Sequence, residues 1–234
     1  HVVEANLGTS DNYACSDLGL FVDPLDGTGE FVSGRLHCVS VLVGISLKGK
    51  PLAGIIVRPF VSDEHPGEFI YGVVGKGAFL DHVRMSPFAS NAAHNVSCIV
   101  TSLKREHRVM EILFASLSSC HIVREGGAGW KSWLVATGVV DAYVYPRGGT
   151  KLWDVLAGDA IVEALGGRTS DACGRPMFYS PTNLGNVWGI MLSRDPHWHR
   201  TVLAPASHAA LVAVANDPNY THWPKGETIP SAAL

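Results

Sequence analysis

Apolar positions along the chain change repeatedly between the two-residue spacing of strands and the wider spacing of helices. Residues 39–47 and 52–58 predict two strands, and the turn sequence Lys48-Gly49-Lys50-Pro51 between them predicts an antiparallel hairpin. Apolar runs predict the other strands at residues 18–22, 68–74, 96–101, 121–124, 142–145 and 187–192. Helical spacing predicts helices at residues 105–117, 130–137, 155–165 and 196–215. The pattern therefore predicts an α/β fold.

Composition bounds the number of domains. The chain has 234 residues, of which 47% are hydrophobic and 17% charged, so it can bury a sizeable core and is not a disordered chain. We expect one domain over residues 1–215, formed by closely packed lobes at about 1–97 and 98–215. Residues 216–234 are polar and contain three prolines, which predicts a flexible tail.

Charge and cysteine content exclude several classes of function. The formal net charge of −3 argues against a nucleic-acid polymer as partner. No apolar run is long enough to span a bilayer, so we expect no membrane partner. The five cysteines include no Cys-x-x-Cys pair, which favours reduced thiols in a cytoplasmic protein and gives no reason to expect a zinc site.

The first segment with recognisable chemistry is Asp23-Pro24-Leu25-Asp26-Gly27-Thr28, which follows the apolar run at residues 18–22. Pro24 has no backbone N–H and a fixed φ, so we expect the strand to stop there. Asp23, Asp26 and the carbonyl oxygen of Leu25 then offer oxygen ligands, and Gly27 lets a phosphate approach the backbone. Asp-Pro and Asp-Gly are also common turn dipeptides, so either one alone would predict only a turn.

The second segment is Trp153-Asp154-Val155-Leu156-Ala157-Gly158, which opens an apolar helical stretch ending at Gly166-Gly167. Asp is a favoured N-cap residue, so Asp154 is expected at the start of a helix. Capping also leaves it free to act as a ligand at an exposed helix end. Three carboxylates then suit hard divalent cations such as Mg²⁺, and a pair of such ions stabilises both oxygens of a phosphoryl transfer.

These two segments, in this order, resemble the signatures of the inositol monophosphatase superfamily of lithium-sensitive phosphatases. Within it, the likeness is greatest to the 3'(2'),5'-bisphosphate nucleotidases. That branch is favoured by Glu30-Phe31, by Gly75-Lys76-Gly77-Ala78-Phe79 and by the sequence from Arg124 to Lys131. The resemblance covers residues 20–204 and implies a layered sugar-phosphatase fold with mixed and antiparallel sheets.

The resemblance also implies a function and a set of site residues. The implied reaction is hydrolysis of the 3'-phosphate of 3'-phosphoadenosine 5'-phosphate by water, with two or three Mg²⁺ ions per site. The implied metal ligands are Asp23, Leu25 (by its carbonyl), Asp26 and Asp154. Thr28 is implied as the catalytic residue that orients the water. The implied substrate contacts are Gly27, Thr28, Thr101, Lys104, Gly127 and Lys131, although the family has a histidine where this chain has Lys104.

The glycine-rich segment at residues 126–129 has two interpretations. Backbone N–H groups at a helix N-terminus bind anions, and glycines allow close approach, which favours a phosphate site. An ordinary strand-to-helix loop would have the same sequence character. The resemblance favours the first interpretation.

Two alternative functions remain. One is an inositol-phosphate phosphatase that uses the same metals, and the other is a catalytically inactive nucleotide-binding form. The second arises because only 22 residues precede Asp23, whereas the family places a longer segment there with a Glu-Glu ligand motif. We therefore expect an incomplete first layer and low activity.

Overall fold

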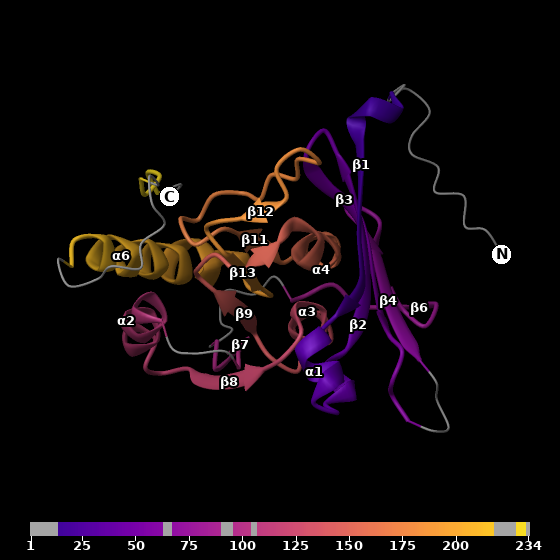
Figure 1. The fold of residues 1–234 in the computed structure, drawn as a ribbon, viewed down its shortest axis with the longest axis horizontal. Helices are drawn as coiled ribbons and strands as arrows, with labels where there is room; N and C mark the ends of the chain where they lie inside the picture. The colour runs from indigo at the N-terminus through magenta and orange to yellow at the C-terminus, as the bar shows by residue number, and fades with distance from the viewer. Residues whose placement is uncertain (1–13, 63–66, 90–95, 104–106, 218–227, 233–234) are drawn as a thin grey trace.

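The computed structural model describes residues 14–62, 67–89, 96–103, 107–217 and 228–232. Its elements form four successive layers, which Figure 1 shows edge-on: a large sheet, a pair of helices, a second sheet and an outer pair of helices. The α/β architecture with mixed and antiparallel sheets confirms the predicted fold class.

The large sheet is antiparallel throughout and its strands follow chain order. The strands are β1 (Leu18–Asp26), β2 (Ser40–Leu47), β3 (Lys50–Arg58), β4 (Glu68–Val73), β5 (Gly77–Leu80) and β6 (Val83–Arg84). The predicted hairpin is therefore confirmed as β2 and β3.

The second sheet is mixed, with strand order β11-β13-β9-β7-β8. Its strands are β7 (Cys98–Ser102), β8 (His121–Glu125), β9 (Ala142–Tyr145), β11 (Arg168–Ser170) and β13 (Ile190–Ser193). Strand β7 runs parallel to both β8 and β9, whereas the other pairs are antiparallel. A separate small pair is formed by β10 (Thr150–Lys151) and β12 (Gly185–Asn186).

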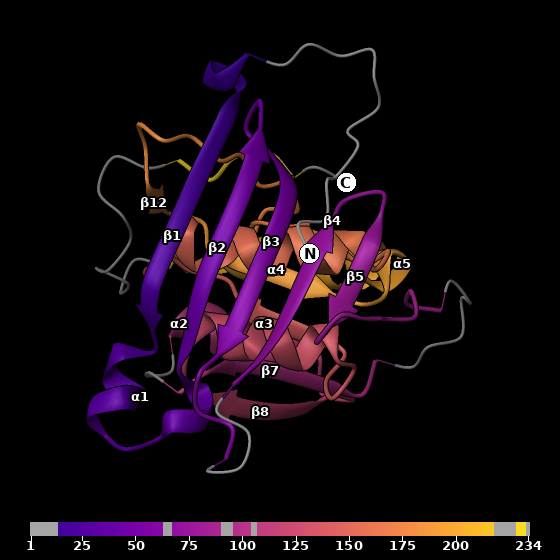
Figure 2. The ribbon, with the colours of Figure 1, turned by 90° about the vertical axis from the view of Figure 1, so that its right-hand side faces the viewer.

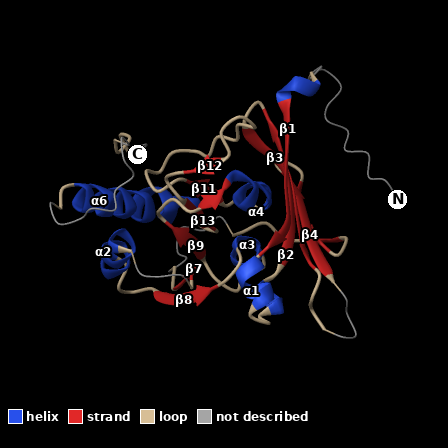
Figure 3. Cartoon of the chain, viewed as in Figure 1, coloured by secondary structure: helices blue, strands red, loops and turns tan. Residues whose placement is uncertain are grey.

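Helices fill and cover the space around the second sheet (Figure 3). The α-helices are α1 (Thr28–Val32), α2 (Arg108–Ser116), α3 (Ala128–Ala136), α4 (Leu152–Ala164), α5 (Pro196–Trp198) and α6 (Ala204–Ala215). Short 3₁₀ segments lie at Cys15–Asp17 and Leu36–Cys38, and a π-helical turn at His199–Leu203 joins α5 to α6. Helices α3 and α4 lie between the sheets, while α2 and α6 pack on the far side of the second sheet.

Helix α4 is mostly apolar, and its apolar side chains pack into the clusters on both sides of it. Val155, Leu156 and Ile161 are fully buried in the two clusters that flank the helix. Glycines in the large sheet allow the close approach: a Cβ on Gly54 would lie 2.3 Å from the carbonyl oxygen of Ala157. This close packing fixes the N-terminal end of α4 relative to the end of β1.

The outer face of the large sheet faces the viewer in Figure 2. Leu18, Leu20 and Val22 of β1 are exposed at 46%, 68% and 47%. Among the helices that the structure describes, none covers this face.

The C-terminal tail is described only at residues 228–232. There Ile229 packs against the hydrophobic cluster that α2 and α6 form with the second sheet. The His208 Nε2 atom lies 3.1 Å from the carbonyl oxygen of Pro230. Residues 218–227 and 233–234 lie outside the described residues, so the flexible tail stays a prediction. The division into two lobes at about residue 97 also stays a prediction. In the described part of the chain, no helix combines the length and apolar character needed to cross a membrane.

Candidate metal and phosphate site

Strand β1 continues through Pro24 to Asp26, so the prediction that it stops before this proline was wrong. The pairing with β2 shifts register between Asp23 and Asp26. Such an irregularity accommodates a residue without a backbone donor and changes the direction of the side chains around it. It brings Asp23, the Leu25 carbonyl and Asp26 to the same end of the sheet.

The turn is held by hydrogen bonds within the motif. The Leu25 N–H donates to Asp23 Oδ1 at 3.0 Å, and the Thr28 hydroxyl donates to the Leu25 carbonyl oxygen at 3.0 Å. Gly27 has φ +79°, and a Cβ there would lie 2.8 Å from the carbonyl oxygen of Cys38. Glycine is therefore required at this position for both its conformation and its space.

Asp26 links the end of β1 to the start of α3. Its carboxylate accepts hydrogen bonds from the Ala128 N–H at 3.1 Å, the Gly129 N–H at 2.8 Å and the Ser40 hydroxyl at 3.0 Å. Burial raises the pKa of Asp26, while these hydrogen bonds and Lys131 oppose the shift. In this structure the N–H groups at the start of α3 donate to a carboxylate of the protein itself, while the phosphate site predicted for the glycine segment stays a prediction.

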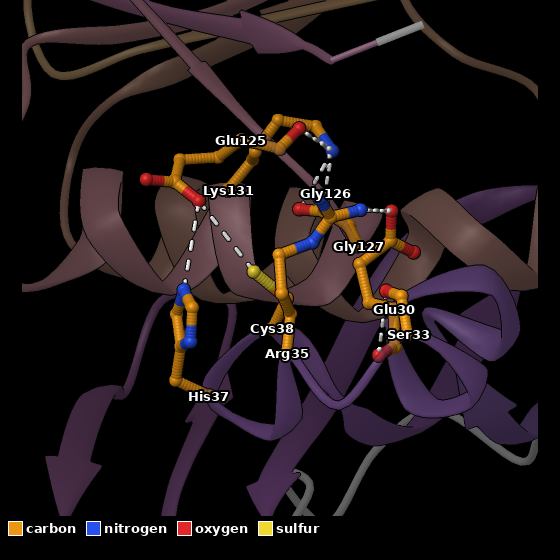
Figure 4. A network of polar contacts seen from close by, with 9 residues as sticks. All are labelled: Glu30, Ser33, Arg35, His37, Cys38, Glu125, Gly126, Gly127 and Lys131. Carbon is orange, nitrogen blue, oxygen red and sulfur yellow. Dashed lines mark hydrogen bonds and ion pairs between the residues drawn. The ribbon is translucent and has the colours of Figure 1, made fainter.

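Lys131 lies in α3 with its side chain directed back toward the loop that precedes the helix (Figure 4). Its Nζ atom donates to the carbonyl oxygens of Gly126 at 3.1 Å and Glu125 at 3.4 Å, and also to that of Gly127. Burial lowers the pKa of Lys131 to about 8, opposed mainly by the charge of Asp26. Lys131 therefore holds the glycine segment in place.

Asp154 is the third residue of α4, and Lys151 occupies the N-cap position that the sequence assigned to Asp154. The Asp154 carboxylate instead accepts a hydrogen bond from the Lys151 backbone N–H at 2.6 Å. Burial raises the pKa of Asp154 to about 7, and the negative charges of Asp26 and Asp23 add to the shift. The charges of Asp23 and Asp26 are thus close enough to act on Asp154.

A cavity of about 400 Å³ joins these features. It is open to solvent and large enough for a small molecule. The predicted site residues that line it are Asp23, Leu25, Asp26, Gly27, Thr28, Gly127, Lys131 and Asp154.

The donor atoms of this cavity fit a hard divalent cation. They are three carboxylates and one backbone carbonyl, all of them oxygen ligands. Burial is the main cause of the raised pKa of Asp154, and a bound cation would offset the additional effect of the Asp26 and Asp23 charges.

The family model for the inositol monophosphatase family matches residues 3–215. The chain belongs to this family. It is 36% identical over 195 residues to 3'(2'),5'-bisphosphate nucleotidase 1 of Dictyostelium discoideum, covering 77% of this chain and 61% of the relative. The human protein of the same name is 34% identical over 168 residues, covering 70% and 53%. The chain thus spans between half and two thirds of the length of these relatives.

A solved structure gives the same fold. An inositol monophosphatase from Zymomonas mobilis has 25% sequence identity and a TM-score of 0.65, with 88% of this chain and 74% of that chain covered. The predicted resemblance to the superfamily is confirmed.

One family-implied contact, Thr101, does not line the cavity. Thr101 is fully buried, and its hydroxyl donates to the Val144 carbonyl oxygen at 2.7 Å, while the next residue, Ser102, lines the cavity. Lys104 lies outside the described residues.

Several cavity residues were missed by the sequence interpretation. Glu30 was used only as a branch marker, although it lines the cavity and pairs with Arg35 at 3.4 Å. Tyr143 and Tyr145 pack in the core and also reach the cavity wall. The other missed lining residues are Gly29, Ser102, Gly149, Thr150 and Trp153, whereas Gly126 and Ala128 belong to the glycine-rich segment already proposed from the sequence. Trp153 and Thr150 could have been proposed as cavity residues because they lie close to Asp154 in the sequence. Nothing in the sequence indicated that the two tyrosines would reach the cavity.

Proposed function

We propose that this chain carries the site of a metal-dependent phosphatase that hydrolyses the 3'-phosphate of 3'-phosphoadenosine 5'-phosphate. The observation that carries the proposal is the meeting of Asp23, Asp26 and Asp154 in one cavity beside the glycine segment. The names of the nucleotidase relatives support the substrate class.

We assign the metal ligands to Asp23, Asp26, Asp154 and the carbonyl oxygen of Leu25, which together would hold two or three Mg²⁺ ions. Such ions lower the pKa of a bound water and stabilise the charge on the leaving oxygen. The acceptor set is anionic and composed of oxygen, which favours Mg²⁺ over softer metals.

The protein's own residues position the reactants. Thr28 is exposed at the cavity, and its hydroxyl oxygen keeps acceptor capacity while donating to Leu25, so it can orient the attacking water. Lys131 fixes the backbone of residues 125–127, against which we place the substrate phosphate. In the reaction the water oxygen bonds to phosphorus, the P–O ester bond breaks, and the leaving 3'-oxygen takes up a proton.

A substrate panel tests the proposal. Phosphate release is measured from 3'-phosphoadenosine 5'-phosphate and from inositol 1-phosphate, with Mg²⁺ and with a chelator. The 234-residue chain and a form extended at its N-terminus from the same coding sequence are compared, because the relatives are longer.

We expect Mg²⁺-dependent release with a higher kcat/KM for the nucleotide. Faster release from inositol 1-phosphate would overturn the assigned substrate in favour of the inositol-phosphate alternative. Nucleotide binding without turnover by the extended form would favour the inactive binding form.

A further inference from the structure

A second group of possible metal ligands lies next to the cavity and outside the aspartate site. Figure 4 shows His37 and Cys38 directed toward the carboxylate of Glu125. Among the residues that the structure describes, these three form the one group of His, Cys, Asp and Glu whose ligand atoms all lie within 4.8 Å of one another.

The three side chains come from two elements that the fold brings together. His37 and Cys38 end the 3₁₀ segment before β2, and Glu125 ends β8. Glu125 Oε2 lies 3.8 Å from His37 Nε2, and it accepts a hydrogen bond from the Cys38 thiol at 3.5 Å. The His37 ring also contacts the edge of Trp130, which restricts its orientation.

The donor types differ from those of the aspartate site. One sulfur, one imidazole nitrogen and one carboxylate oxygen form a set that suits Zn²⁺, whereas Mg²⁺ prefers oxygen alone. Three protein ligands with a fourth position open to water is a common zinc arrangement. The side chains of His37 and Glu125 are 52% and 28% exposed, so an ion can enter from their side while Cys38 supplies the buried ligand.

We propose that His37, Cys38 and Glu125 form a binding site for a zinc ion, distinct from the aspartate site. The metal–sulfur bond forms as the thiol proton leaves to water, and small side-chain rotations bring the three ligand atoms to coordination distance. The thiol lies in surroundings that oppose its ionisation, since burial raises the pKa of Cys38 to about 11. The Gly126 backbone N–H donates to the sulfur and partly offsets this effect.

The position of the site links it to the cavity. The residue after Glu125 is Gly126, which lines the cavity together with Gly127. The Glu125 carbonyl also accepts a hydrogen bond from Lys131. A Cβ on Gly127 would lie 2.2 Å from the Cys38 carbonyl oxygen, which shows how closely the two segments pack. An ion held by Cys38 and Glu125 therefore restrains the loop against which we place the phosphate.

Cobalt substitution tests the site without relying on phosphatase activity. The 234-residue chain is titrated with Co²⁺ in the presence of excess Mg²⁺, and the thiolate-to-cobalt charge-transfer absorption is recorded. Zn²⁺ affinity is then measured by displacement of the cobalt. The variants are Cys38→Ser, His37→Ala and Glu125→Gln, with Cys120→Ser and His121→Ala as controls on a half-buried thiol and an exposed histidine outside the group.

We expect one equivalent of thiolate-bound cobalt, displaced by zinc. Cys38→Ser should lose the charge-transfer absorption, and His37→Ala and Glu125→Gln should weaken zinc binding by at least about tenfold. Asp23→Asn should keep the absorption, which separates this site from the proposed catalytic one. The proposal is overturned if the parent chain shows no thiolate absorption, or if His37→Ala, which changes an exposed side chain, binds zinc as tightly as His121→Ala.

Discussion

At the scale of single residues, Asp26 has two roles, one in holding the fold together and one in the proposed metal site. Its carboxylate accepts hydrogen bonds from the backbone N–H groups of Ala128 and Gly129 and from the Ser40 hydroxyl. It is also one of the proposed metal ligands. Asp23, by contrast, accepts one hydrogen bond from the Leu25 N–H, which an asparagine oxygen can also accept.

We predict that Asp26→Asn destabilises the fold as well as the metal site. An asparagine has only one acceptor oxygen, so its amide group would face a backbone or hydroxyl donor in a buried place. An unsatisfied buried group of this kind costs about 1–3 kcal/mol. Urea unfolding measures the effect, with Asp23→Asn as the control expected within about 0.5 kcal/mol of the parent. Equal stability of the two variants would contradict the structural role of Asp26.

The sequence could indicate the proposed ligands on β1 because they lie within one hexapeptide whose turn chemistry is local. It could not predict the orientation of Lys131. That orientation depends on Asp26 occupying the helix N-terminus, which is a contact between residues 102 positions apart or more. Thr101 was expected in the cavity because of the family resemblance, whereas strand pleating buries it and presents Ser102 instead.

At the scale of elements, the position of Asp154 depends on how closely α4 packs against the large sheet. The contact is made where Gly54 of β3 meets the backbone of Ala157. A side chain at this point would push the helix away from the sheet, and with it the start of α4.

We predict that Gly54→Ala lowers the free energy of unfolding by about 1–3 kcal/mol, since the added methyl group would overlap a backbone atom that cannot rotate away. Thermal unfolding measures this effect. The matched control is Gly29→Ala in α1, where nothing lies within 4 Å of the added Cβ. The packing argument fails if the two substitutions change Tm equally.

The long elements were predicted well because their apolar periodicity extends over several turns or residue pairs. Strands β5, β6, β10, β11 and β12 were missed, since two to four residues carry too little pattern. Pro24 misled the prediction for β1 because a local rule was applied where an irregular pairing tolerates the proline.

At the scale of the whole molecule, stability depends on an acidic group buried between the two sheets. Asp159 of α4 accepts a hydrogen bond from the Tyr179 hydroxyl at 2.5 Å. Burial raises the pKa of Asp159 from 3.8 to about 7, and the charge of Glu163 adds to the shift. Between about pH 4 and pH 7 the folded protein therefore keeps a proton on Asp159 that the unfolded chain has released, so folding stability falls as pH rises through this range.

We predict that Asp159→Asn removes this loss. As pH rises from about 5 to about 8, the difference in free energy of unfolding between variant and parent should shift in favour of the variant by on the order of 2 kcal/mol. Urea unfolding at the two pH values measures the change, with the exposed Glu111→Gln as control. A parent-to-variant difference that does not change with pH would contradict the assignment.

The layered architecture was predictable as a class from the alternation of strands and helices, and its details followed from the family resemblance. The sequence analysis did not place α3 and α4 between the sheets, although both are apolar on more than one side whereas α2 has a distinct polar face.

The central claim is that the aspartates of the cavity hold the metal that drives phosphate release. Its most direct test is Mg²⁺-dependent turnover of 3'-phosphoadenosine 5'-phosphate by the N-terminally extended form, compared with the same form carrying Asp23→Asn. The account predicts a loss of at least about 10²-fold in kcat/KM with an unchanged Tm, because a ligand charge is removed while its hydrogen bond is kept. Turnover by Asp23→Asn within about threefold of the parent would contradict the account.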